Sequence, residues 1–194
     1  MKKTLILFLS LVLMFTFAAC GGGGGNASSE SSAPAESGNT PSGEAKADEN
    51  RYYSIGEAAE ADGLSITIDK VESPDSDIFL NGPKDGFAYI KVYFTFKNIS
   101  NETIKTPKRQ AIYIVYEEGP TGDDCDMTSD KSSEDVLPGK KEGIYNAFTE
   151  LASCESVSGW MVYPRQSDKA EVTMHYYSRF VNVPPDLRFS FAVE

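Results

Sequence analysis

The sequence predicts an all-β fold, an antiparallel β-sandwich of seven to eight strands, and two observations carry this prediction. Between Arg51 and Glu194, apolar residues recur at every second position in several short runs that turn residues separate. The same part of the chain contains no long run with the 3.6-residue period of an amphipathic helix. Strands that are apolar on one face bury that face by packing as two sheets.

The strands are predicted in chain order from these runs. The clearest extends from Phe87 to Lys97, where the Ala, Ile, Val and Phe residues from Ala88 to Phe96 share one face because side chains alternate along a strand. Other predicted strands cover 64–68, 112–116, 159–163, 170–177 and 187–193, with less regular ones at 57–61 and 143–151. Predicted turns between them include Asp62-Gly63, Gly119-Pro120, Pro138-Gly139 and Pro184-Pro185.

The first twenty residues predict a lipoprotein signal. Lys2 and Lys3 precede an uncharged stretch that is short for a membrane span, and Ala18-Ala19 stand directly before Cys20. This order resembles a bacterial lipobox, whose cysteine is diacylated and becomes the first residue of the mature chain, although Phe17 stands where leucine is usual. We expect 1–19 to be the signal peptide and Cys20 the lipidation site. The alternative is an ordinary secretory signal followed by a chance cysteine.

Residues 20–50 are predicted to be the lipidated cysteine and a flexible, disordered linker. Gly21 to Asn50 include no aromatic and no branched aliphatic residue, so nothing there can be buried to offset the entropy of ordering. A Gly/Ser-type chain of this length has a root-mean-square reach of about 30 Å. The composition changes at Arg51, and 51–194 are predicted to form one domain.

Several short segments of this domain follow one another in a recognisable order. They are Ile55-Gly56-Glu57, Asp62-Gly63-Leu64, Phe96-Lys97-Asn98, Leu137-Pro138-Gly139-Lys140 and the run from Ser158 to Pro164. Together they resemble a family of uncharacterised bacterial lipoprotein domains that is related to immunoprotective extracellular antigens, over most of residues 55–178. The resemblance implies an immunoglobulin-like sandwich on the cell surface. It supplies no catalytic residue, no cofactor and no ligand.

The charge balance excludes one class of partner. The chain has 18 basic and 29 acidic residues, for a net charge of −11, and nucleic-acid binding needs clustered Lys and Arg. Loss of Lys2 and Lys3 with the signal peptide would leave 16 basic against 29 acidic residues, or −13. Anionic lipid headgroups repel such a protein, so we expect the lipid itself to hold it at the membrane.

Two cysteines remain once Cys20 is lipidated. Exported cysteines meet an oxidising environment, so a disulfide between Cys125 and Cys154 is expected, closing a loop of about 29 residues and adding about 3–4 kcal/mol of stability. The alternative is two free thiols.

An acidic segment, 121–135, is the densest charge cluster of the domain. Asp124, Asp126 and Asp130 alternate in the way of a calcium loop, but Ser129 stands where such a loop needs glycine. A solvated loop between strands is the preferred interpretation, with a weak calcium site as the alternative.

Two other features could carry chemistry. Strand alternation predicts that His175 faces solvent, and the chain has no Gly-x-Ser-x-Gly motif to supply a nucleophile. Tyr89 and Tyr93 share the outer face of the long strand; cover by loops or the chain termini is the preferred interpretation, with a weak partner surface as the alternative.

We therefore expect a non-enzymatic, cell-surface lipoprotein that is lipid-anchored on the outer side of the membrane and acts as a binding or interaction module. Its expected partner is an envelope protein or a wall polymer, with no cofactor. The alternative function is ion or small-ligand sensing through the acidic loop 121–135.

Overall fold

The computed structural model describes residues 51–118, 124–179 and 184–193. The chain divides into two units between Gly43 and Glu44, and all of the described residues belong to the second unit. The predicted signal peptide, Cys20 and the linker lie outside the described residues. No helix in the described part is both long and apolar enough to cross a membrane.

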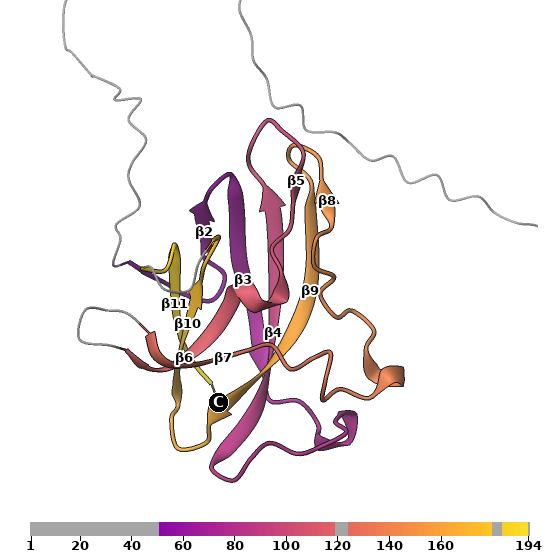
Figure 1. Ribbon diagram of the computed structural model, residues 1–194, viewed down its shortest axis with the longest axis vertical. Coiled ribbons are helices and arrows are strands. Elements are labelled where there is room, and N and C mark those ends of the chain that lie inside the picture. Colours follow the sequence, from indigo (N-terminus) through magenta and orange to yellow (C-terminus); the bar gives the residue numbers. More distant parts are fainter. Residues whose placement is uncertain (1–50, 119–123, 180–183, 194) are drawn as a thin grey trace, which may run out of the picture. The chain divides into compact units, whose positions relative to one another are not determined.

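Two stacked sheets and a small ribbon make up the domain (Figure 1). The five-stranded sheet has the order β1 (Tyr52–Tyr53), β11 (Leu187–Ala192), β10 (Glu171–Tyr176), β6 (Ile112–Glu118) and β7 (Asp124–Ser129). The four-stranded sheet has the order β2 (Ala58–Ala61), β3 (Leu64–Glu72), β4 (Phe87–Asn98) and β9 (Ser156–Gln166). β5 (Ile104–Lys105) and β8 (Glu150–Leu151) form the ribbon.

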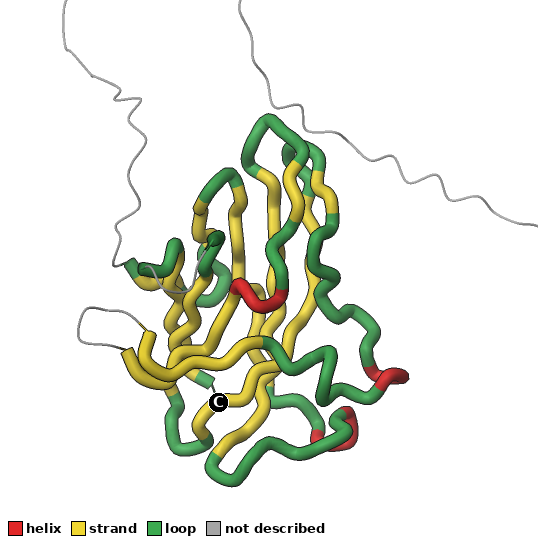
Figure 2. Tube along the Cα trace, viewed as in Figure 1, coloured by secondary structure: helices red, strands yellow, loops and turns green. Residues whose placement is uncertain are grey.

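The predicted all-β sandwich is confirmed. Strands and loops dominate the described chain, and its helices are three short 3₁₀ turns (Figure 2), η1 (Ser76–Ile78), η2 (Arg109–Ala111) and η3 (Pro138–Lys140). Strand pairs are antiparallel except β1 and β11, which run parallel. The described residues contain eleven strands against the expected seven to eight, and three of the eleven have only two residues.

The alternation of side chains along the strands explains which residues form the core. In β4 the side chains of Ile90, Val92, Phe94 and Phe96 have no exposed surface, as the pattern predicts. They pack against apolar residues of β3 and of the five-stranded sheet, such as Met174 and Phe189. Burying a side chain of this size stabilises the fold by about 1.5–3 kcal/mol, so the core residues fix how the two sheets stack.

Two predicted segments differ from the structure. The expected strand at 143–151 is a strand only at Glu150–Leu151, because Gly143 turns with a φ of +77° and the chain then docks on β9. The expected acidic loop is wrong for 124–129, which form β7 and pair with β6. Cross-strand hydrogen bonds overcome the low strand propensity of the aspartates in this segment.

Candidate functional site

A second apolar cluster covers the outer face of the four-stranded sheet. Val136, Trp160 and Val162 are its buried members, and Phe79, Tyr89, Tyr93 and Ile144 pack against them. The segment that follows β7 supplies Val136 and therefore lies over this sheet. The outer face of β4 is thus half-buried.

Tyr89 and Tyr93, the weak candidates for a partner surface, pack against this one cluster but make different contacts. Tyr93 donates its hydroxyl hydrogen to Glu72 at 2.7 Å, and the Lys91 ammonium lies 4.9 Å from the centre of its ring. Tyr93 is therefore committed to contacts within the sheet. Tyr89 packs against Phe79 at 4.4 Å between ring centres and lines a pocket. Burial, together with the nearby Asp135 carboxylate, raises the pKa of Tyr89 to about 12.

This pocket has a volume of about 530 Å³ and is the candidate functional site. Its aromatic and apolar surface comes from Phe87, Tyr89, Tyr116, Pro83, Met127 and Pro164. Polar groups come from Lys84, Thr128, Lys131 and Asp135. Pockets of about 300–1,000 Å³ that combine apolar walls with a few polar groups are the usual sites for small ligands.

One wall is made where two loops pair. The backbone N–H of Leu80 donates to the Asp135 carbonyl at 2.6 Å, and that of Leu137 donates to the Ile78 carbonyl at 2.9 Å. The chain then turns through Gly86, whose φ of +83° favours glycine, and enters β4 at Phe87. These contacts place Lys84 and Asp135 beside the outer face of β4.

Tyr116, at the end of β6, forms the opposite wall. Its hydroxyl group donates to the Pro164 carbonyl at 2.6 Å, and its ring meets that of Phe87 edge to face with 5.5 Å between centres. Both contacts hold the ring in one position. The Tyr116 ring is therefore positioned before any ligand binds, which limits the entropy that binding must overcome.

The two lysines of the pocket differ. The Lys131 ammonium lies 3.2 Å from the Glu134 carboxylate, in an exposed ion pair. Lys84 is exposed, and its ammonium forms no ion pair with an acidic group of the described chain. Lys84 is thus the more available hydrogen-bond donor for a ligand.

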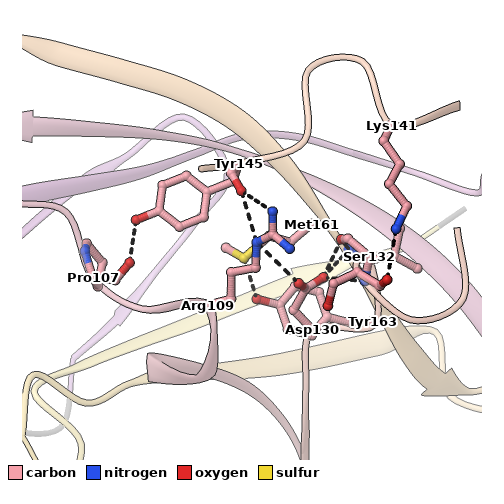
Figure 3. Close-up of polar contacts among 10 residues, drawn as sticks. Pro107, Arg109, Asp130, Ser132, Lys141, Tyr145, Met161 and Tyr163 are labelled. Carbon is pink, nitrogen blue, oxygen red and sulfur yellow. Dashed lines mark hydrogen bonds and ion pairs between the residues drawn. The ribbon is translucent and has the colours of Figure 1, made fainter. Parts of the chain in front are cut away.

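A buried polar network anchors the loop that carries Lys131 (Figure 3). Oδ1 of Asp130 accepts hydrogen bonds from the backbone N–H groups of Ser132, at 2.8 Å, and Val162, at 3.0 Å, and from the Ser132 hydroxyl. Oδ2 lies 3.8 Å from Nε of Arg109 and has no hydrogen-bond partner in the described part of the chain. Arg109 also donates to the Tyr145 carbonyl from Nε and Nη2. The network fixes the loop to β9.

A second pocket of about 220 Å³ adjoins the first, and Tyr116 lines both. Its polar groups come from Arg165, Gln166, Lys169, Glu171 and Thr173. Nη1 of Arg165 donates to the carbonyls of Gln166 and Lys169, whereas its buried Nε has no hydrogen-bond partner among the residues with described positions.

The prediction that His175 faces solvent is wrong. It lies on β10, the central strand of its sheet, opposite Tyr113 and Arg188 on the neighbouring strands, and has no exposed surface. Alternation correctly places it on the face away from the core. On that face the Tyr177 ring packs edge-on against His175 at 6.3 Å between ring centres, and the neighbouring Arg188 is also buried.

The expected disulfide between Cys125 and Cys154 is not formed in this structure, where Cys154 is free and exposed. Cys154 lies in the turn after β8, and its N–H donates to the Asn98 carbonyl at 3.0 Å. Cys125 belongs to β7, on the edge of the other sheet. β7 and β8 lie well apart in Figure 1, which explains why their segments are not bridged.

The calcium site stays a prediction. The side chains of Asp124 and Asp126 lie outside the described residues, and Asp130 is buried in the network with Arg109. Within the described part, no three His, Cys, Asp or Glu side chains gather in a way that could hold a metal.

Comparisons with known proteins concern the fold alone. No protein-family model matches the chain, and no curated protein matches it. The yjhA protein of Bacillus subtilis is 17% identical over 73% of this chain and 99% of that chain, with a TM-score of 0.46. The "putative lipoprotein" ycdA of Bacillus subtilis is 15% identical over 70% of this chain and 38% of that chain, also with a TM-score of 0.46.

An uncharacterized β-sandwich protein of Clostridium difficile is 16% identical over 76% of this chain and 97% of that chain, with a TM-score of 0.37. The structural neighbours are thus uncharacterised bacterial proteins, and the specific family that the motifs resemble stays a prediction.

Proposed function

We propose that the protein is a lipid-anchored lipoprotein of the cell envelope whose β-sandwich acts as a non-catalytic binding module, with the pocket beside β4 as its binding site. The signal sequence and Cys20 support the anchor. The pocket supports binding, because it joins an aromatic surface, with Tyr116 held by a hydrogen bond, to a small set of donors and acceptors. This combination is the observation that carries the proposal.

The alternative function, ion or small-ligand sensing through the acidic segment 121–135, involves the same pocket. Met127 and Thr128 of β7 and Lys131 and Asp135 of the following turn all line the pocket. Residues 127–135 of the acidic segment thus contribute one side of the proposed binding site.

The test uses the full-length lipoprotein in detergent micelles and envelopes isolated from the cells that make it. Lys84→Ala removes the available donor, and Phe87→Ala removes part of the aromatic surface. Lys84→Ala is expected to weaken sedimentation with the envelopes at least tenfold, since a lost hydrogen bond to a charged group is worth about 1.5–3 kcal/mol. Phe87→Ala is expected to have an effect of similar size, since it removes apolar area that a ligand would cover.

Lys97→Ala is the matched control, because Lys97 is exposed on β4 and does not line the pocket. Thermal melting confirms that each variant is folded. Equal envelope binding by the two pocket variants, Lys97→Ala and the unaltered protein would contradict the proposal.

A further inference from the structure

We infer that the ligand of this site is a glycan chain of the cell wall, with one sugar on the aromatic surface of the first pocket and the chain continuing past Tyr116 into the second. This inference rests on the proposed function and names the chemical class of its ligand. Four observations on the described residues support it.

The first pocket is lined by aromatic rings. Phe87, Tyr89 and Tyr116 contribute three aromatic side chains to one surface. The face of an aromatic ring carries partial negative charge, which attracts the weakly positive C–H groups on the flat side of a pyranose ring. Hydroxyl groups then project from the edge of the sugar towards polar neighbours.

The charged side chains of the first pocket include both positive and negative groups. Lys84 and Lys131 donate hydrogen bonds, Asp135 accepts them, and Thr128 can do either. A sugar hydroxyl group is both donor and acceptor, so it is satisfied by this mixture. A ligand that carried only negative charge would meet Asp135, and one that carried only positive charge would meet the two lysines.

The second pocket repeats this mixture next to the first. Arg165 and Lys169 supply donors, and Glu171 supplies an acceptor. Pro164 and Arg165 are consecutive in β9 and line the first and the second pocket respectively. Because consecutive side chains point to opposite faces of a strand, the pockets lie on either side of β9, the edge strand of its sheet, and a chain that occupies both must pass over this edge beside Tyr116, which lines both.

A peptide that binds by adding a strand is disfavoured at the middle of β9, beside the site. The Trp160 N–H donates to the Gly143 carbonyl, the Tyr145 N–H donates to the Trp160 carbonyl, and the Lys131 N–H donates to the Val162 carbonyl. The Val162 N–H donates to Asp130. Because these backbone groups already have partners within the chain, strand addition has no free edge there.

The experiment measures binding of the full-length lipoprotein, in detergent micelles, to protein-free cell wall from the cells that make it. One wall sample is digested with a glycosidase that cuts the glycan chains, and a matched sample is treated to remove only the peptides. The glycan inference predicts that binding falls at least tenfold after glycan digestion and is kept after peptide removal.

Two variants test the path of the chain. Lys84→Ala in the first pocket and Lys169→Ala in the second are each expected to weaken wall binding about tenfold. Lys97→Ala, on the same strand as Phe87 but outside both pockets, is expected to bind as the unaltered protein does. Both altered lysines are exposed, so the fold is expected to survive, and melting checks this.

Each adverse result identifies what fails. Binding that survives glycan digestion but is weakened by Lys84→Ala overturns the inference that the ligand is a glycan, and it still supports the proposed binding site. Binding that is weakened by Lys84→Ala but not by Lys169→Ala overturns the two-pocket path. Wall binding unaffected by either variant overturns the inference altogether, and unchanged envelope binding by Lys84→Ala and Phe87→Ala separately overturns the proposed function.

Discussion

Asp130 shows how one residue can join the two sheets at an energetic cost. Its carboxylate is buried at the end of β7, where it binds the backbone of β9 through Val162 and faces Arg109. Burial raises the pKa of Asp130, and the hydrogen bonds from Ser132 and Val162 and the charge of Arg109 oppose this shift only in part. The charged form is therefore less favourable in the folded protein than in water.

This residue predicts a pH dependence of stability. Because the folded-state pKa lies above the unfolded one, folding favours the protonated carboxyl, and its stabilising contribution is lost as pH rises through the folded pKa. Urea unfolding from about pH 3 to pH 8 measures this. The unfolding free energy of the protein minus that of Asp130→Asn should fall as pH rises. A difference that is constant over this range would show that Asp130 does not titrate differently on folding.

At the scale of elements, alternation predicted β4 and its core face but could not predict what covers its other face. The cover comes from 78–80, 130–137 and 143–145, segments with no regular period that are held by hydrogen bonds to each other and to β9. For the same reason the pocket was not predicted, because its lining residues extend from Gly82 to Pro164 and only the folded chain brings them together. The prediction that His175 is exposed was wrong because alternation shows which face of the sheet a side chain occupies, but not whether other residues bury that face.

The docking of 143–145 on β9 requires a glycine at position 159, because a side chain there would collide with the docked segment. A Cβ atom on Gly159 would lie 2.6 Å from Cα of Tyr145, which is backbone and cannot move aside easily. Gly159→Ala is therefore expected to destabilise the protein by about 1–3 kcal/mol in urea unfolding. In Gly139→Ala, the matched control, the new methyl group meets nothing within 4 Å, and the change should stay within about 0.5 kcal/mol. Equal stability of both variants would show that this close approach is absent in solution.

At the scale of the whole molecule, the sandwich is expected to be stable without a disulfide. Cys154 is free, so both Cys125 and Cys154 should react with an alkylating reagent when the protein is unfolded without reduction. Cys154→Ser should change the unfolding free energy by less than about 0.5 kcal/mol. A bridge would instead block both thiols, and its loss would cost about 3–4 kcal/mol.

The pairing of β1 with β11 determines when the domain can form. These are the first and last strands of the described chain, and they are neighbours in one sheet. A ribosome releases Tyr52 and Tyr53 long before Leu187–Ala192, so the five-stranded sheet cannot be completed before Ala192 has left the ribosome. If the signal sequence directs export, the chain can cross the membrane before this sheet has closed, and folding is completed only on the far side.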